Sequence, residues 1–343
     1  MDRKQQTDIV YNYGTFEFGP DFYTKFIQAK LLYTLSFENY NDFVYEYQYD
    51  NRSVIEQVLN LTCLEKNNLY KALQINALPQ NRSYKYDFLY DNCTTRAGNI
   101  IITNTNAPVH FGSVLPNKPL TFRDMIHIYL NSSHQYWSKL GIDILLGANL
   151  DKKVNNKEAM FLPDYLMTGF NTASTAAHPL VLSQQTVLQG KSPDPSGILA
   201  TPWAILTLIF LLVVIVSLIH KKWALAFLSG FDFLFFFVLG LSGLLLLFMW
   251  FGREDNVCRN NFNLLWALPL HVVMAFYVRS NQSWAKKYFK LVFWLTSALV
   301  VAWFFLPQQM NNALIPVLLL ILYRSFYISK KMVYAGKTDR AVQ

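Results

Sequence analysis

The sequence predicts an α+β domain followed by an α-helical membrane bundle of five spans, in one chain of 343 residues. Three observations predict this division: long apolar runs occur only after residue 196, aromatic and polar residues alternate near the start, and the basic excess lies in the second half. Residues 1–196 carry 17 Lys+Arg and 18 Asp+Glu, whereas residues 197–343 carry 13 and 4. Basic residues placed between apolar runs are typical of membrane topology and argue against nucleic-acid binding.

Five apolar segments of the second half are candidates to cross a bilayer. The first, 197–219, contains no charge, and its 23 residues would reach about 34 Å as a helix. The others are 225–251, 264–278, 291–306 and 313–328. Asp232 lies inside the second segment, and His271 lies beside Pro269 in the third. Polar groups at such depth are candidates for function or for packing, and we favour packing for both.

The connecting loops orient this bundle. Eleven basic residues lie at alternate ends of the segments: Lys221, Lys222, Arg279, Lys286, Lys287, Lys290, Arg324, Lys330, Lys331, Lys337 and Arg340. The opposite loops hold only Arg253 and Arg259. The positive-inside rule places these eleven basic residues in the cytoplasm. Residues 1–190 then lie outside the cytoplasm. An exported domain needs a signal peptide or an earlier span, and "MDRKQQTDIVYNYGTF" is neither, so we expect a further segment upstream.

These patterns predict four parts of the chain. They are an extracytoplasmic domain at 1–190, a linker at 191–197 within "LQGKSPDPSG", a membrane domain at 198–330 and a cytoplasmic tail at 331–343. In the first domain, alternating aromatic residues predict strands at 8–18 and 43–50, and helical spacing predicts helices at 20–33 and 53–78. The stretch "YKYDFLY" predicts a strand or tight segment, "TTRAGNIIITN" a helix, and 120–178 several short helices.

Cys93 is the candidate nucleophile, in "YKYDFLYDNCTTRAGNII". If Asn92 and Cys93 open a helix, the thiol lies in the first turn, where free N–H groups and the helix dipole favour a thiolate. Arg96 would lie on the same face and add positive charge. Such a thiolate suits nucleophilic acyl transfer. Two alternatives stay open: Cys93 as a small buried apolar residue, and a disulfide with Cys63.

Other residues near Cys93 are weaker candidates. Asp87 and Asp91 either orient a base or cap a turn, and Tyr90 either offers a hydroxyl to an oxyanion or lies in the core. His110 is a weak candidate base, because "APVHFGS" predicts a surface loop. The sequence contains no CxxC, HExxH, GxGxxG, GxxxxGK[ST] or GxSxG, so we predict no metal site and no soluble cofactor.

The stretch "YDFLYDNCTTRAGN" resembles the signature of the extracytoplasmic domain of the lipoprotein N-acyltransferases of Bacteroidota. Residues 11–36, 145–173 and 262–271 agree with the same family, so the resemblance covers nearly the whole chain. It implies a permuted papain-like thiol-enzyme fold with Cys93 as nucleophile. It also implies a phospholipid acyl donor, a thioester intermediate and a diacylated lipoprotein as acceptor, in a bacterial inner membrane with the first domain periplasmic and the C-terminus cytoplasmic.

One feature of that family is missing from the sequence. The family carries a Phe-Gly-His element near the start of the mature domain, whereas this chain has no histidine before His110. We therefore expect the family's general base upstream of residue 1. Two rival functions remain: a membrane-tethered cysteine peptidase or amidase that acts on the cell wall, and a non-enzymatic channel, receptor or scaffold in which Cys93 is buried.

Overall fold

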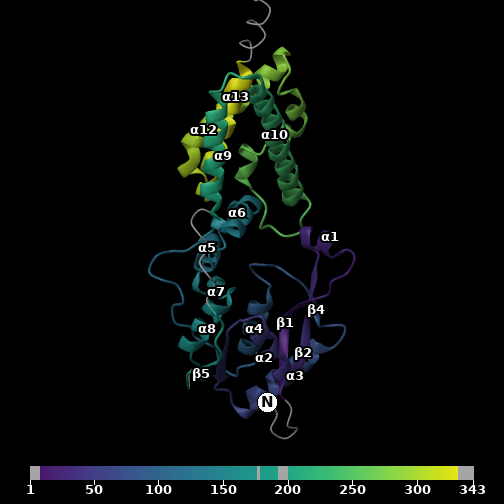
Figure 1. Ribbon diagram of the computed structural model, residues 1–343. Coiled ribbons are helices and arrows are strands. Elements are labelled where there is room, and N and C mark those ends of the chain that lie inside the picture. The colour runs from purple at the N-terminus through teal and green to yellow at the C-terminus, as the bar shows by residue number, and fades with distance from the viewer. Residues whose placement is uncertain (1–7, 176–177, 192–199, 331–343) are drawn as a thin grey trace, which may run out of the picture. The chain divides into compact units, whose positions relative to one another are not determined.

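The computed structural model describes residues 8–175, 178–191 and 200–330 (Figure 1). The chain forms two compact units, one of Met1–Ile126 with Lys152–Pro193 and one of His127–Asp151 with Asp194–Gln343. Residues 127–151, which the sequence assigns to the extracytoplasmic domain, thus belong to the second unit. The predicted tail, and the predicted linker apart from residue 191, lie outside the described residues.

The first unit contains two small antiparallel sheets. One has the strand order β1-β2-β4 and the other pairs β3 with β5. Their bounds are β1 Ile9–Phe16, β2 Leu32–Asn39, β3 Val54–Leu59, β4 Ser83–Lys85 and β5 Val181–Leu188. The register of β1 against β2 shifts between Asn12 and Thr15, which marks a bulge. The two-stranded sheet therefore joins a strand from the early part of the unit, β3, to one from its end, β5.

Helices pack around these sheets. They are α1 Phe22–Ile27, α2 Tyr40–Tyr49, α3 Cys63–Ala77, α4 Cys93–Ile102, α5 Phe122–Ser132, α7 Asn156–Ala159 and α8 Pro163–Thr172, of which α5 runs from the first unit into the second. Thr62 and Asn92 begin α3 and α4 with capping boxes, in which cap and third residue satisfy each other's backbone N–H. Buried Tyr13, Leu35 and Tyr84 form the core that holds α4 against the three-stranded sheet.

Two predicted elements of this unit are wrong in type. Residues 43–49 belong to a helix, and aromatic residues four apart meet on one face of it: the Phe43 and Tyr47 ring centroids are 4.5 Å apart. The helix predicted at 53–78 is confirmed only in its second half, as α3. Residues 54–59 form the strand β3 instead, and its partner β5 lies too far along the chain for a local pattern to reveal it. The helix predicted at 20–33 ends earlier, at Ile27, and Ala29 then turns the chain with a φ of 56°.

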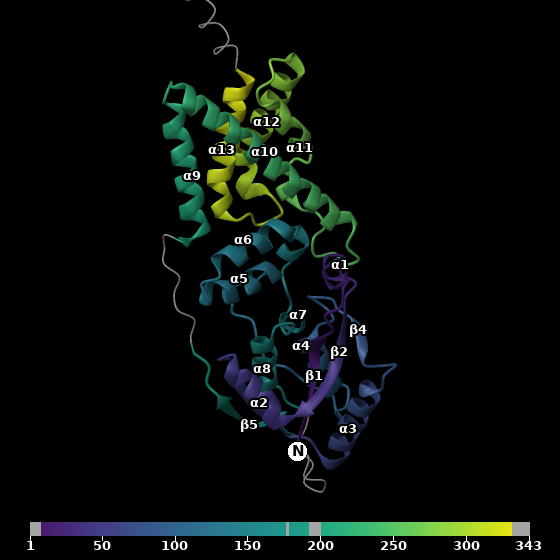
Figure 2. The same cartoon turned by 45° about the vertical axis from the view of Figure 1, so that its right-hand side comes forward.

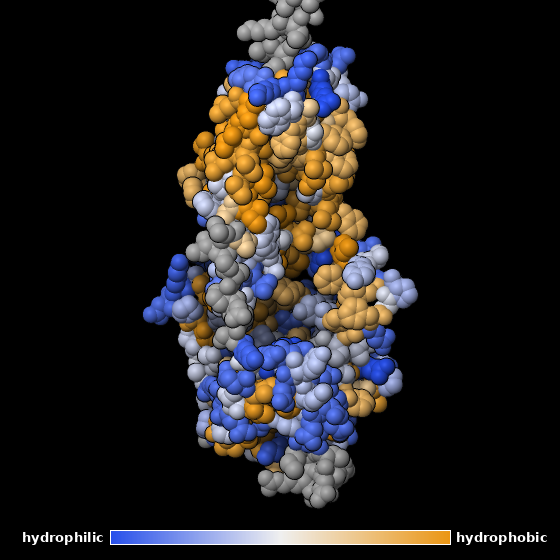
Figure 3. All heavy atoms as spheres, in the orientation of Figure 1, coloured by the Kyte–Doolittle hydropathy of each residue, from blue (hydrophilic) through white to orange (hydrophobic). Residues whose placement is uncertain are grey.

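The second unit is helical (Figure 2). Its helices are α6 Tyr136–Leu145, α9 Pro202–Ser217, α10 Lys222–Phe251, α11 His271–Met274, α12 Ser283–Ala302 and α13 Ile315–Ser329. Among the described residues, three stretches are long and apolar enough to span a membrane: Lys222–Phe251, Ser283–Phe305 and Asn312–Ser329. Figure 3 shows apolar side chains over much of this unit, with hydrophilic ones at the end where α13 finishes.

The third predicted span is a broken segment. It consists of the 3-10 turn Phe262–Leu265, the short helix α11 and the 3-10 turn Ala275–Tyr277. Pro269 has no N–H to continue a helix. The segment packs directly on α10, where a Cβ added to Gly240 would lie 2.1 Å from the Val272 nitrogen. With α9 only 16 residues long as described, the number of five spans stays a prediction.

Candidate functional site

Cys93 is the first residue of α4, as expected if Asn92 opens the helix. The Asn92 side-chain oxygen accepts the Thr95 N–H at 2.9 Å, and the Thr95 hydroxyl oxygen accepts the Asn92 N–H at 2.9 Å. The Asn92 amide nitrogen donates to the carbonyl oxygens of Phe88 and Phe161, at 2.9 and 3.0 Å. A buried, fully bonded Asn92 therefore fixes the position of the cysteine that follows it.

The first turn of α4 presents two unused backbone donors beside the thiol. Within the described part of the chain, the N–H groups of Cys93 and Thr94 have no acceptor. This is the usual state of the first amides of a helix, and it makes them available to a developing negative charge.

Three tyrosines surround the cysteine on the side of the sheet. The rings of Tyr33 and Tyr86 stack with centroids 4.0 Å apart, and the Tyr84 hydroxyl donates to the Tyr13 carbonyl at 2.6 Å. Burial raises the pKa of Tyr33, Tyr84 and Tyr86, and a negative charge on Cys93 would raise these pKa values further. All three therefore keep their hydroxyl protons at neutral pH. They give Cys93 a largely apolar surround.

Cys93 lies on the wall of a cavity of about 630 Å³. The walls come from β1, α2, β3, α4 and α8, and the lining is mainly apolar, including Phe43, Leu59, Leu166 and Phe170. The bulge of β1 brings Gly14 close: a Cβ there would lie 3.9 Å from the Cys93 sulfur. The volume falls in the ordinary range of small-molecule sites. The lining contains one carboxylate, Asp164, and no histidine among the described residues.

Arg96 and Asp91 form an ion pair of their own. The Arg96 Nε and Nη2 donate to the two Asp91 oxygens, each at 2.7 Å, and the guanidinium lies 3.8 Å from the Tyr84 ring centroid. Both side chains line a separate hollow of about 450 Å³, which does not include Cys93. The positive charge expected beside the thiol is thus shared with a carboxylate.

The remaining candidates of the first unit lie away from the cavity lining. Asp87 accepts the N–H groups of Leu89 and Tyr90, at 2.9 and 3.0 Å, and so caps a turn. Tyr90 is 54% exposed, and its ring makes a T-shaped contact with that of Phe122. His110 is exposed, and its backbone pairs with Ser174. None of Asp87, Tyr90 and His110 is among the described residues that line the Cys93 cavity.

The cysteines themselves are all free thiols. Cys63 is exposed at the start of α3, Cys93 is half-buried and Cys258 is buried. The structure therefore contains no Cys63–Cys93 disulfide, and Cys93 is not the fully buried apolar residue of the other alternative.

The two polar candidates of the membrane segments have partners. Asp232 is completely buried and accepts two hydrogen bonds from Arg324, at 2.7 and 2.9 Å. The His271 Nδ1 lies 2.7 Å from the Tyr288 hydroxyl. These contacts join α10 to α13 and α11 to α12, so both residues tie helices of the bundle together.

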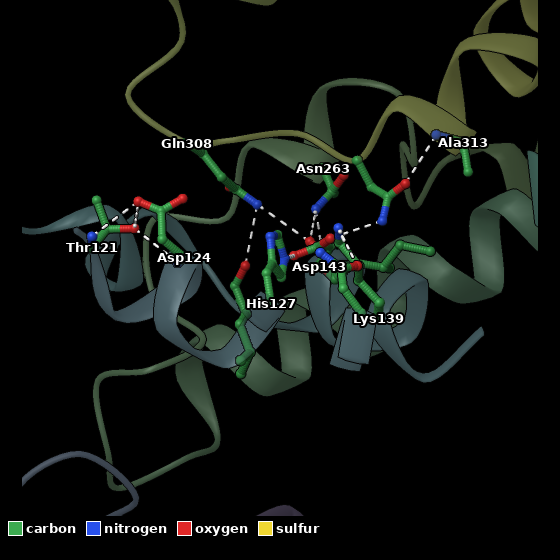
Figure 4. A network of polar contacts seen from close by, with 12 residues as sticks. Thr121, Asp124, His127, Lys139, Asp143, Asn263, Gln308 and Ala313 are labelled. Atoms are coloured by element: carbon green, nitrogen blue, oxygen red, sulfur yellow. Dashed lines mark hydrogen bonds and ion pairs between the residues drawn. The ribbon is translucent and has the colours of Figure 1, made fainter. Parts of the chain in front are cut away.

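A buried polar network in the second unit has no signal in the sequence patterns (Figure 4). Asp143 of α6 is 1% exposed; its Oδ1 is 2.8 Å from the His127 Nε2, and its Oδ2 accepts the Asn311 amide at 2.8 Å. Asn261 donates to the Ile144 and Leu145 carbonyls.

Further amides act at the same helix end. Asn263 donates to the Asp143 carbonyl at 2.9 Å, and Gln308 donates to the Leu146 carbonyl at 3.1 Å. A helix end needs partners for its last carbonyls when it is buried. Side chains from the loops of the bundle supply them here. Together with the packing of Leu140, Ile144 and Leu145 in the core of the bundle, these bonds attach residues 127–151 to the second unit.

Two family models match the chain. Together with the fold and the site, these matches define a membrane protein of lipoprotein biogenesis, with an α+β periplasmic domain and a helical transmembrane domain. The family model "Lnb N-terminal periplasmic domain" matches residues 1–127, and "Lnb transmembrane domain" matches residues 194–334, together more than three quarters of the chain. The chain belongs to the Lnb lipoprotein N-acyltransferase family. It is therefore an inner-membrane protein of lipoprotein maturation with its N-terminal domain in the periplasm. Comparisons with curated proteins and with solved structures each gave no match.

Proposed function

We propose that the protein transfers a fatty acyl chain from a phospholipid, through a thioester on Cys93, to the N-terminal amine of a diacylated lipoprotein. The observation that carries this proposal is the place of the thiol. A free, half-buried cysteine begins a capped helix and lies on the wall of a mainly apolar cavity of about 630 Å³. An acyl chain is the kind of ligand that such a lining accommodates.

The chemistry proceeds in two balanced steps. The Cys93 thiolate attacks the ester carbonyl of the phospholipid, the C–O bond breaks, and the lysophospholipid leaves with a proton. The lipoprotein's α-amino group then attacks the thioester, loses a proton and releases the thiolate. In both steps the carbonyl oxygen becomes negative. The free N–H groups of Cys93 and Thr94, at the positive end of the α4 dipole, are suited to stabilise that oxyanion.

The first unit also carries aromatic side chains suited to a lipid surface. In the connection from β1 to β2, Phe18, Tyr23 and Phe26 are 77%, 75% and 55% exposed. Phe22 lies between them, with its ring centroid 4.5 Å from that of Phe18. Aromatic residues of this kind concentrate at membrane–water interfaces. Their exposure supports an acyl donor drawn from the bilayer.

Mass spectrometry of a lipoprotein's N-terminal peptide tests the proposal. A strain that lacks its own N-acyltransferase would express the full open reading frame as wild type, Cys93→Ser or Cys63→Ser. Cys63 is the matched control, because it too is a free cysteine at the start of a capped helix. We expect a third acyl chain with wild type and Cys63→Ser and none with Cys93→Ser.

Two results would contradict this expectation. Triacylated peptide from an equally abundant Cys93→Ser protein would exclude a Cys93 thioester. Diacylated peptide from abundant wild type, together with released fatty acid, would indicate a hydrolase with water as the acceptor.

A further inference from the structure

A second cavity lies inside the membrane unit, at the end where α10 begins and α13 finishes. Its volume is about 480 Å³. Apolar side chains, among them Leu225 and Ile328, form part of the wall. The polar part of the lining includes Ser217, Ser229, Asp232, Arg279, Asn281 and Arg324. Neither the Cys93 chemistry nor the network around Asp143 uses any of these residues.

The first of the two arginines in this cavity is already neutralised. Arg324 donates through Nε and Nη2 to both oxygens of Asp232, and its Nη1 donates to the Ser217 hydroxyl at 3.1 Å. Arg324 and Asp232 are 4% and 0% exposed, so this pair is a fixed part of the wall. It contributes no net charge to the cavity.

The second arginine keeps its charge. Arg279 donates through Nε to the Ser229 hydroxyl, and its terminal nitrogens have no partner among the described residues. Asp232 is the one carboxylate among the described lining residues, and Arg324 already occupies both of its oxygens. The cavity therefore carries a net positive charge with unused guanidinium donors, beside the Asn281 side chain and next to apolar walls.

We propose that this cavity binds a phosphate group, supplied by the headgroup of an anionic phospholipid. A guanidinium presents paired donors that match phosphate oxygens. Leu225 and Ile328 would contact the apolar part of the lipid nearest the headgroup. The surrounding end of the unit holds Lys221 and Lys222, and such basic ends of membrane helices attract anionic lipids.

Thermal unfolding of the purified protein in neutral detergent tests this site. The additions would be phosphatidylglycerol, diacylglycerol with the same chains, and inorganic phosphate. We expect phosphatidylglycerol to raise the midpoint of wild type, and its apparent affinity to fall about tenfold or more in Arg279→Gln, which loses a charge-assisted contact. Arg259→Gln, the same change in the loop after α10, is the matched control and should respond like wild type.

Each other outcome also decides the question. The proposed site would be overturned if phosphatidylglycerol bound Arg279→Gln and wild type with equal apparent affinity. It would also be overturned if diacylglycerol raised the midpoint of wild type as much as phosphatidylglycerol does. If inorganic phosphate raises the unfolding midpoint and phosphatidylglycerol does not, the cavity binds phosphate but not a lipid headgroup, and the proposed lipid is excluded. If Arg279→Gln unfolds at a lower midpoint without any addition, Asn281→Ala replaces it, and an unchanged affinity for phosphatidylglycerol in that variant would then reject the proposal.

Discussion

The Asn92 side chain, next to Cys93, both caps a helix and bonds two backbone carbonyls. Its oxygen caps α4, while its nitrogen satisfies the carbonyls of Phe88 and Phe161. Asn92→Ala removes the cap and leaves both carbonyls without this donor, so we expect the free energy of unfolding to fall by about 2 kcal/mol. Asn92→Asp keeps the cap acceptor but loses the donor, and it should lie between wild type and alanine.

Pulse proteolysis in urea would measure both Asn92 variants, with acyl transfer assayed in parallel. The order wild type, aspartate, alanine is expected for stability. Equal stability of alanine and wild type would show that the capping box does not hold the turn that carries Cys93.

The buried Asp232–Arg324 ion pair makes the stability of the bundle sensitive to substitution of either residue. Removing one partner leaves a buried charge without compensation, so we expect Asp232→Asn to cost about 3–5 kcal/mol. The double variant Asp232→Leu, Arg324→Met removes both charges, and it should recover most of that loss. Thermal unfolding in detergent would compare the three proteins. A double variant that is less stable than Asp232→Asn would show that the pair itself stabilises the fold.

At the scale of elements, α10 depends on glycine where the broken segment crosses it. A Cβ on Gly240 would lie 2.1 Å from the Val272 nitrogen, which is a backbone atom and not the end of a flexible side chain, whereas a Cβ on Gly230 of the same helix would meet nothing within 4 Å. We expect Gly240→Ala to lower the yield of folded protein severalfold and Gly230→Ala to leave it unchanged. Size-exclusion profiles of the two proteins, purified side by side, would show this difference, and matching profiles would refute the close approach.

Local patterns were sufficient for some elements and insufficient for others. The start of α4 at Cys93 agrees with the prediction that Asn92 and Cys93 open a helix, and the capping box of Asn92 and Thr95 lies within four residues of chain. The strand β3 depends on β5, about 130 positions later, and no local pattern contains that partner. The alternation along "FVYEYQY" predicts a strand where α2 forms, because aromatic residues at every second position also recur at the four-residue spacing of a helix.

The same limit applies to the site. Cys93 and its helix were predictable, because one motif contains them. The ion pair between Arg96 and Asp91 was not, since spacing alone cannot say that Arg96 turns toward Asp91 and the Tyr84 ring. The cavity wall from β3 and α8 was also out of reach, because it joins segments more than 100 residues apart.

At the scale of the whole molecule, both polar and apolar side chains of α6 attach it to the second unit: Leu140 is buried in the core of that unit. Asn261, Asn263 and Gln308, from two loops of the membrane unit, bond the last carbonyls of α6. The apolar runs indicate where the helices of that unit lie. They do not indicate that residues 127–151, upstream of the first run, bind to the loops of the unit. The hydropathy pattern therefore locates the three long apolar stretches of the unit, and it misses residues 127–151.

Orientation in the membrane is the remaining whole-molecule prediction, and the native cysteines allow a direct test. Cys63 is exposed in the first unit, whereas Cys258 is buried and burial raises the pKa of its thiol to about 11. At pH 7.5, where about a tenth or less of an ordinary thiol is ionised, Cys258 stays protonated and should not react. With Cys93→Ala as background, a membrane-impermeant maleimide should label Cys63 in intact spheroplasts.

The opposite side is probed by Gln282→Cys, at the exposed start of α12 among the basic residues. In a background without the native cysteines it should react only after the membrane is opened, because the positive-inside rule places this end in the cytoplasm. Labelling of Gln282→Cys in intact spheroplasts, together with no labelling of Cys63 in the Cys93→Ala protein, would show the opposite topology. The basic cavity would then lie on the periplasmic side, so the labelling of these two cysteines also determines which leaflet supplies its lipid.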